Sequence, residues 1–187
     1  YGNINFLKGG LAFADKITTV SPTYAQEIMS AEQGFGLQGI LQQRAADVTG
    51  ILNGVDYSEW SPEIDPFIAQ RYCETDLTGK RICKDKLQGS VGLPVKSAVP
   101  VLGMVSRLTS QKGFDLVQKI FDQLMEQQIQ LVLLGSGEER YESFFVTAAA
   151  RFPEKFAVQT GFDEALAHRI EAGADIFLMP SLYEPCG

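Results

Sequence analysis

Two cations lie close together in a segment that has the features of an anion site. Arg107 and Lys112 belong to the stretch MVSRLTSQKG, in which an apolar strand ends near Val105 and a helix begins near Gly113. The first turn of a helix favours anions, because free backbone N–H groups point outward there and the dipole end is positive. A guanidinium adds a forked donor and an ammonium a point charge. We therefore predict a diphosphate clamp; two solvated surface cations would give the same spacing, but the acidic remainder of the chain favours the clamp.

A second candidate is Glu184, in the final stretch SLYEPCG. This stretch follows the apolar run ADIFLMP, for which we predict a buried strand, and α/β proteins place their chemistry in loops after such strands. A carboxylate beside a diphosphate would be repelled, so we expect Glu184 to accept hydrogen bonds from a sugar hydroxyl or to orient a cation. The alternative is an exposed loop acid. Cys186 is interpreted as a small apolar residue, because no base that could activate a thiol is evident nearby.

Two glycine-bearing stretches give weaker signals. Gly135 and Gly137, in LLGSGEER, imitate the opening of a dinucleotide fingerprint that is not completed. We expect them to allow a tight backbone turn, close to a ligand. The stretch Lys8-Gly9-Gly10 lacks the spacing of a phosphate-binding loop, so a simple turn is the better interpretation.

Composition excludes several classes of function. The 187 residues carry a net charge of −7, which argues against general binding to nucleic acid or to anionic membranes. No apolar stretch approaches the ~20 residues that span a bilayer. Three cysteines without CxxC spacing fit a reduced intracellular protein better than a zinc site or a disulfide framework. The chain has a single histidine, His168, which argues against a histidine-based metal site and against a Ser-His-Asp triad. We interpret His168 as an ordinary helix-surface residue.

The elements that must position these residues alternate regularly from about Ala98 onward. Apolar runs predict strands, and amphipathic segments between them predict helices; Phe114, Val117, Phe121 and Leu124, for example, share one helical face. This order predicts right-handed βαβ units and a doubly wound parallel sheet. The predicted strands are 98–106, 130–135, 155–161 and 174–180, and the predicted helices are 113–127, 138–152 and 163–173.

The part before Ala98 has a looser pattern. Residues 14–30 predict a strand and then a helix, with Ser21 as N-cap and Pro22 as the first helical residue. The stretch VTGILNGVDY predicts another strand, and Asn53-Gly54 is a possible hairpin turn. From about Tyr57 to Pro100, prolines and glycines indicate a crossing between domains. Because the chain does not begin with Met and stops inside a loop, we expect a piece of a larger protein.

Four stretches together resemble one family along almost the whole chain: ADKITTVSPTYAQEI, GILNGVDYSEWSPEIDP, VSRLTSQKGFDLV and GADIFLMPSLYEPCG. They are similar to glycogen synthase and starch synthase of the ADP-glucose-dependent type. The resemblance implies a retaining glycosyltransferase of the GT-B kind, in which two Rossmann-like domains face a cleft and glucose passes from ADP-glucose to the non-reducing end of an α-1,4-glucan. It implies that residues 1–50 are the tail of the N-terminal domain, 51–97 a linker and connector, and 98–187 the first part of the C-terminal domain.

The resemblance also implies roles for the candidate residues. Arg107 and Lys112 match the cations on the donor diphosphate, and Glu184 matches the first glutamate of the donor-sugar motif. Asn53 matches an asparagine near the donor sugar.

Four further positions match family sites. Gly161 and Phe162 match the position that contacts the adenine, where many members have tyrosine. Cys186 and Gly187 match the start of the loop whose backbone amides meet the phosphates. Neither a metal nor a cofactor is implied. The family's N-terminal Lys-x-Gly-Gly donor loop is absent, and Lys8 does not align with it.

Alternatives to this function stay open at the level of the sequence. They are a retaining GT-B enzyme that uses a UDP- or GDP-sugar, a catalytically inactive nucleotide-binding piece, and a nicotinamide oxidoreductase, which only the GSG stretch supports. We expect the isolated chain to be inactive and to bind ADP weakly. The resemblance implies a cytoplasmic bacterial enzyme, or a plastid enzyme if it is a plant starch synthase. The oligomeric state is not predicted.

Overall fold

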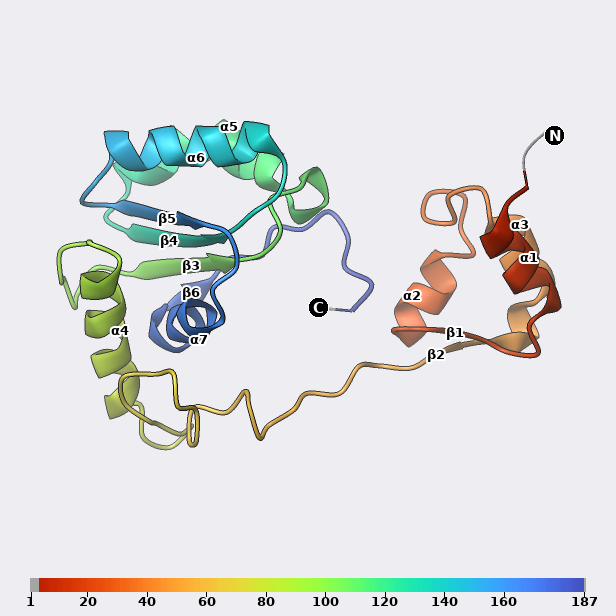
Figure 1. The fold of residues 1–187 in the computed structure, drawn as a ribbon, viewed down its shortest axis with the longest axis horizontal. Coiled ribbons are helices and arrows are strands. Elements are labelled where there is room, and N and C mark those ends of the chain that lie inside the picture. Colours follow the sequence, from red (N-terminus) through yellow and green to blue (C-terminus); the bar gives the residue numbers. More distant parts are fainter. Residues whose placement is uncertain (1–3, 187) are drawn as a thin grey trace. The chain divides into compact units, whose positions relative to one another are not determined.

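In the computed structural model, residues 4–186 are described, and the chain divides into two compact units. One unit contains the chain up to Val55 together with the residues from Glu184 onward, and the other runs from Asp56 to Tyr183. Both are built from parallel strands and helices (Figure 1). None of the helices in the described part of the chain has the length and apolar character needed to cross a bilayer.

The first unit contains a small parallel sheet. Strand β1 pairs with β2, with Ile17 opposite Val48. Helix α2 begins as predicted, because the Ser21 hydroxyl accepts a hydrogen bond from the Tyr24 N–H at 2.9 Å and Pro22 is the first helical residue. The elements are α1 (Phe6–Phe13), β1 (Ile17–Thr19), α2 (Pro22–Glu27), α3 (Gln38–Gln43), the 3-10 helix η1 (Ala45–Asp47) and β2 (Val48–Gly50).

Two local predictions in this unit are wrong. Lys8, Gly9 and Gly10 lie inside helix α1, where the Asn5 side chain accepts a hydrogen bond from the Lys8 N–H, so they do not form a turn. Asn53-Gly54 forms no hairpin turn either, since β2 ends at Gly50 and the chain continues without regular structure. A hairpin needs an antiparallel neighbour, whereas β2 pairs in parallel with β1.

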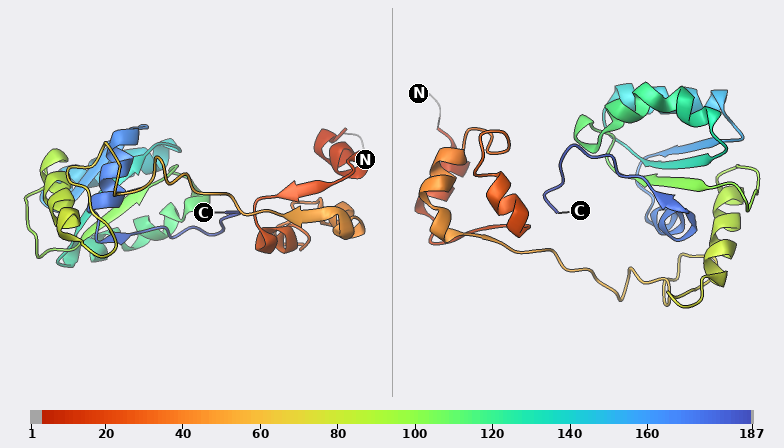
Figure 2. Two further views of the ribbon diagram at one scale, coloured as in Figure 1. Left: turned by 90° about the horizontal axis from the view of Figure 1, so that it is seen from below. Right: turned by 180° about the vertical axis from the view of Figure 1, so that it is seen from behind.

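The second unit contains the predicted doubly wound parallel sheet, in the order β5-β4-β3-β6. Helices α5 and α6 cover one face of this sheet, and α4 and α7 cover the other (Figure 2). Its elements are α4 (Thr78–Ser90), β3 (Val101–Val105), the 3-10 helix η2 (Ser110–Lys112), α5 (Phe114–Glu126), β4 (Gln130–Gly135), α6 (Glu139–Arg151), β5 (Phe156–Thr160), α7 (Glu164–Gly173) and β6 (Ile176–Phe177).

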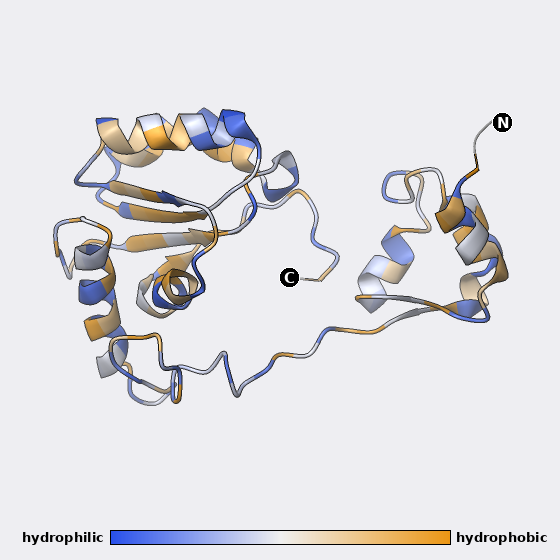
Figure 3. Cartoon of the chain, viewed as in Figure 1, coloured by the Kyte–Doolittle hydropathy of each residue, from blue (hydrophilic) through white to orange (hydrophobic). Residues whose placement is uncertain are grey.

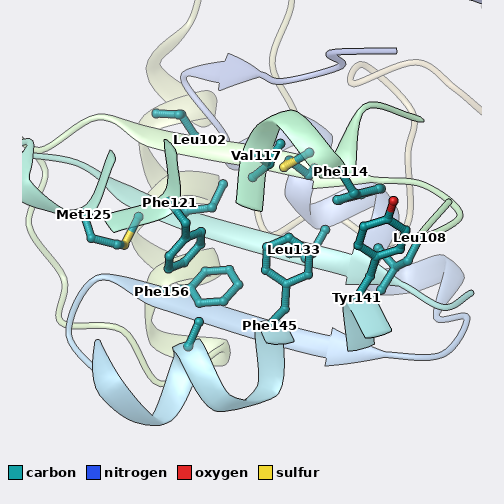
Figure 4. Packing of buried hydrophobic residues seen from close by; sticks show 13 residues of the cluster. Leu102, Leu108, Phe114, Val117, Phe121, Met125, Leu133, Tyr141, Phe145 and Phe156 are labelled. Carbon is teal, nitrogen blue, oxygen red and sulfur yellow. The ribbon is translucent and has the colours of Figure 1, made fainter. Parts of the chain in front are cut away.

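The core on the α5–α6 face is rich in aromatic residues. Strand residues that alternate along β3 and β4 point to this face, and the predicted helical stripe of Phe114, Val117 and Phe121 meets them (Figure 4). Phe121 lies edge-on to Phe156, with ring centroids 5.0 Å apart. Offset and edge-to-face aromatic pairs add to the free energy gained from burying their area. This face holds the start of α5 firmly against the sheet.

Helix α4 was not predicted, although it packs closely against α7 on the other face. Only one narrow stripe of α4 is apolar, and Cys83 and Leu87 are its buried hydrophobic residues. Gly173 of α7 allows the close approach, because a Cβ atom there would lie 3.0 Å from the Cys83 carbonyl oxygen. Hydrophilic, intermediate and hydrophobic residues are mixed along this helix, as its colouring in Figure 3 shows.

The predicted buried strand over 174–180 is shorter and more exposed than expected. Only Ile176 and Phe177 form β6, and their exposed fractions are 52% and 41%. β6 pairs with β3 alone and lies at the edge of the sheet among the described residues. An edge strand has a neighbour on one side only, so its apolar sequence does not by itself imply burial.

Candidate functional site

The strand order of the second unit reverses beside β3, the position at which open α/β sheets form a ligand-binding crevice. The chain leaves β3 toward β4 on one side, whereas β6 lies on the other side of β3. In open α/β sheets, ligands bind at such a reversal of strand order, outside the carboxyl ends of the strands. The loops after β3 and β6 flank this position, and they contain SRLTSQKG and the start of SLYEPCG. The strongest sequence motif therefore lies where this architecture binds ligands.

The loop after β3 presents Arg107 to solvent and carries Lys112 in the short helix η2. Helix α5 begins directly afterward at Phe114, with Gly113 as its N-cap. Gly113 has no side chain to cap the first turn, so the positive end of α5 is left without a side-chain cap. A guanidinium, an ammonium and a helix N-terminus thus come from one loop, as the sequence predicted.

Neighbouring residues anchor Arg107 on both sides. Leu108 is fully buried; its N–H donates to the Ser136 carbonyl oxygen at 2.9 Å, and its own carbonyl accepts from the Glu138 N–H at 2.9 Å. A Cβ atom at Gly135 would overlap the Ser106 carbonyl, and one at Gly137 would overlap the Leu108 carbonyl. These glycines therefore allow the loops after β3 and β4 to pack backbone to backbone.

Helix η2 also contacts the loop after β6. The Gln111 carbonyl accepts a hydrogen bond from the Leu182 N–H at 2.8 Å, and the Gln111 Nε2 donates to the Tyr183 carbonyl at 3.3 Å. Gly113 has a φ of 76°, and a Cβ atom there would overlap the Pro180 carbonyl oxygen. The two loops that flank the crevice are therefore held against each other by close backbone contacts.

A polar network engages the carboxylate of Asp115 in the first turn of α5. Asp115 lies in the first turn, and its Oδ1 accepts a hydrogen bond from the Tyr141 hydroxyl at 2.7 Å. Arg140 donates to the same hydroxyl at 2.7 Å and lies 3.6 Å from Asp115. Burial, reinforced by the hydrogen bond to Asp115, raises the pKa of Tyr141 to about 12. Because Asp115 is engaged by Arg140 and Tyr141, it opposes an anion at the helix start less than a bare carboxylate would.

The carboxyl end of β5 presents an exposed aromatic ring. Phe162 is 88% exposed, and Gly161 before it has a φ of 111°. Asp163 then caps α7 by accepting a hydrogen bond from the Leu166 N–H at 2.8 Å, and this bond is the main cause of the lowered pKa of Asp163. The cap fixes the backbone directly after Phe162, which leaves the ring free to stack on a planar group.

The predicted site residues thus fall into three groups. Arg107, Lys112, Gly161 and Phe162 lie at the carboxyl edge of the sheet in the second unit, as their places after β3 and β5 require. The exposed Asn53, together with Glu184 and Cys186, belongs to the first unit. Gly187 lies outside the described residues. Within residues 4–186, no three His, Cys, Asp or Glu side chains are arranged to hold a metal ion.

The interpretation of His168 as a helix-surface residue is wrong. Its side chain is 2% exposed, its Nδ1 lies 2.6 Å from Oδ2 of Asp65, and its ring stacks on Trp60 with centroids 3.8 Å apart. The segment from Trp60 to Tyr72, here called the strap, covers α7 and so buries the imidazole. Burial raises the pKa of Glu171 and of Tyr72, which lie beside this pair. A sequence shows no periodic signal for a contact of this kind, because the strap has no regular structure.

Two family models match parts of this chain. The family model described as glycosyl transferases group 1 matches residues 90–187, more than half of the chain. The chain belongs to this family. The model of the starch synthase catalytic domain matches residues 1–43 of this group 1 glycosyl transferase.

Curated relatives cover the whole chain. It is 54% identical over 187 residues to the glycogen synthase of Anaeromyxobacter dehalogenans (strain 2CP-1) and 53% identical to that of Koribacter versatilis. It spans 39% and 38% of the length of these two relatives. The predicted resemblance to glycogen and starch synthases, and the prediction of a partial chain, are therefore confirmed.

Solved structures support the fold. The catalytic domain of starch synthase IV from Arabidopsis thaliana, bound to ADP and acarbose, aligns with a TM-score of 0.92 and 38% identity. The alignment covers 98% of this chain and 38% of that one. Anabaena HepE in complex with UDP-glucose aligns with a TM-score of 0.57 and 18% identity over 94% of this chain and 41% of that one, a likeness of fold alone. The predicted Rossmann-like α/β fold of GT-B type is confirmed.

Proposed function

We propose that the whole protein transfers glucose from ADP-glucose to the non-reducing end of an α-1,4-glucan, with retention of configuration. The observation that carries this proposal is the placement of Arg107, Lys112 and the start of α5 in one loop beside the crevice of the sheet. The starch synthase IV structure, which is similar over almost the whole chain, contains ADP and acarbose. The cations of the chain fit a diphosphate donor, and the ADP in the similar structure supports ADP-glucose as that donor.

The chemistry follows from charge. When the bond between glucose and ADP breaks, negative charge develops on the leaving diphosphate. Arg107 and Lys112 would stabilise that charge together with the positive end of α5, and preorganised groups of this kind supply the largest share of many rate enhancements. The engagement of Asp115 by Arg140 and Tyr141 reduces repulsion of the donor. We propose that these two cations take the charge-neutralising role and that the step needs no metal.

The remaining residues would orient the donor. Phe162, exposed at the end of β5 beside Gly161, would stack on the adenine. Glu184 and Asn53 would accept or donate hydrogen bonds to the glucose hydroxyls. The backbone amides at Cys186 and Gly187 would contact the phosphates. The relatives are bacterial, and we propose that the enzyme acts in the cytoplasm.

A full-length chimera tests the proposal. The matching stretch of the Anaeromyxobacter dehalogenans relative is replaced by these 187 residues, and thermal unfolding first establishes that the product is folded. We expect ADP release when ADP-glucose and glycogen are supplied together. A folded chimera that releases no ADP would sink the proposal.

The preferred sugar nucleotide distinguishes this proposal from a retaining GT-B enzyme that uses a UDP- or GDP-sugar. The same chimera is assayed with ADP-glucose, UDP-glucose and GDP-glucose at equal concentrations. We expect the highest kcat/KM with ADP-glucose, because the similar starch synthase IV structure contains ADP. A preference for UDP-glucose or GDP-glucose would instead support a retaining enzyme with a different donor.

A further inference from the structure

A cavity of about 690 Å³ opens at the amino edge of the sheet in the second unit. Its walls come from one side of α4, from the segment before β3 and from the turn between α7 and β6. The loop with the predicted donor cations follows the other end of β3, and a strand of five residues is about 16 Å long. The cavity is therefore separate from the candidate donor site. Its charged lining residues are Lys80, Arg81, Lys84, Asp85 and Asp175.

The two acids of this cavity are engaged by neighbouring groups. Oδ2 of Asp175 lies 2.8 Å from the Lys84 Nζ and accepts a hydrogen bond from the Val101 N–H at 2.7 Å. The Lys84 ammonium also donates to the Ser97 carbonyl at 3.0 Å, and its side chain is only 10% exposed. Oδ1 of Asp85 accepts from the Ser97 hydroxyl at 3.1 Å. Lys84 and Asp175 thus form a pair that joins α4 to the starts of β3 and β6.

The other two cations form no ion pair with a carboxylate in the described part of the chain. The Lys80 ammonium donates to the Ala172 carbonyl at 2.9 Å, near the end of α7, and lies 5.6 Å from the centroid of the Tyr72 ring. Burial lowers the pKa of Lys80, although the charge of Asp175 acts in the opposite direction. Arg81 is exposed, and its guanidinium has no hydrogen bond within residues 4–186. The cavity therefore has uncompensated positive charge in a chain whose net charge is −7.

We propose that this cavity binds a small phosphate monoester. A guanidinium donates forked hydrogen bonds to phosphate and an ammonium pairs with it as a point charge, and Arg81 and Lys80 supply both groups. An anion beside Lys80 also offsets the cost of removing its ammonium from water. The cavity has the size of a small-molecule site and exceeds a free phosphate, so room is left beside Leu77 for the organic part of an ester. This second site goes beyond the proposed transfer of glucose and does not depend on it.

The test is a calorimetric titration of glycerol 3-phosphate into the full-length chimera, in which Arg107→Ala and Lys112→Ala remove the cations of the donor site. We expect saturable binding at one site. Arg81→Gln removes the open charge and should weaken this binding by about tenfold to a hundredfold, as the loss of a hydrogen bond from a charged group predicts. The matched control is Lys86→Gln, which removes an exposed cation of α4 outside this cavity and should leave the affinity unchanged.

The ligand controls are glycerol and inorganic phosphate. Glycerol should not bind, and inorganic phosphate should bind more weakly than the ester, because it leaves the space beside Leu77 unfilled. Thermal unfolding of Arg81→Gln should match that of its parent, since Arg81 makes no contact that its loss would break. Absence of saturable binding to the folded chimera would overturn the inference, as would equal affinities of Arg81→Gln and Lys86→Gln. Tighter binding of inorganic phosphate would overturn the assignment to an ester.

Discussion

The imidazole of His168 and the carboxylate of Asp65, which are 103 residues apart in sequence, form a buried pair with an Nδ1–Oδ2 distance of 2.6 Å. Oδ1 of Asp65 also accepts a hydrogen bond from the Phe67 N–H at 2.8 Å. The strap makes further polar contacts with the helices beneath it: Arg169 Nε donates to the Phe67 carbonyl and the Tyr72 hydroxyl donates to the Ala172 carbonyl. The strap is therefore a fixed part of the second unit.

Removal of Asp65 should loosen the strap. Asp65→Ala leaves the buried His168 without its partner, and we expect a loss of about 2–4 kcal/mol in the free energy of unfolding. Trp60, the only tryptophan of the chain, stacks on His168 and reports the change as a red shift of its emission. Denaturation in urea, followed by this emission, gives both quantities. Glu74→Ala, at an exposed position, is the control, and equal stability of the two variants would contradict the prediction.

An added side chain should lower the free energy of unfolding more at Gly113 than at Gly92. Gly113 and Gly92 have φ values of 76° and 78°, but only at Gly113 would a Cβ atom overlap another residue, the Pro180 carbonyl. Gly92→Ala measures the backbone cost alone, about 1–2 kcal/mol. Gly113→Ala adds overpacking, for a total of about 2–5 kcal/mol. Chemical denaturation compares the two variants; similar losses would show that the contact between the loops does not matter.

The stability of the second unit should fall at high pH because of Tyr141. Its folded-state pKa of about 12 is raised above the ordinary value of 10.0, so the neutral phenol contributes stability below pH 10, and this contribution is lost as the pH rises toward 12. The shift corresponds to about 2–3 kcal/mol. Tyr141→Phe should lose about 1 kcal/mol at neutral pH, from the missing hydrogen bond to Asp115, and should decline less between pH 10 and 12.

The measurement is the free energy of unfolding at a series of pH values for the wild type, Tyr141→Phe and Tyr57→Phe. Tyr57 is 72% exposed and serves as the control for the other alkaline titrations of the chain. The wild type and the Tyr57 variant should decline in parallel. A Tyr141 variant that declines just as steeply would show that this phenol does not control alkaline stability.

The two cations should be needed for turnover in the active chimera. Arg107→Ala or Lys112→Ala removes a group that stabilises charge on the leaving diphosphate, and each should lower kcat by about 10²- to 10³-fold. Lys119→Ala removes a cation from an exposed position on α5 and should leave kcat unchanged. Steady-state assays of ADP release provide the comparison. Wild-type turnover in either of the first two variants would refute the assigned role.

Local patterns predicted much of the second unit correctly. The period and length of the hydrophobic pattern predicted the type and order of six elements, because each of these signals lies within a few consecutive residues. These elements are β3, α5, β4, α6, β5 and α7. The same local chemistry predicted the cap of α2 at Ser21. It also placed Arg107 and Lys112 between a strand and a helix, from which the parallel sheet brings them to the carboxyl edge.

The features that only the tertiary structure decided all depend on partners remote in sequence. His168 is buried because a strap about a hundred residues earlier covers it, and Gln111 contacts the loop after β6 because that loop returns to it. The apolar residues of β6 are exposed because the sheet has its edge there among the described residues. Periodicity reports which way a side chain points along its own element, but burial and hydrogen bonding depend on which other elements pack there. The sequence by itself therefore determined the elements and the cations of the site, and the packing of distant segments decided how the loop that leads to Glu184 is held.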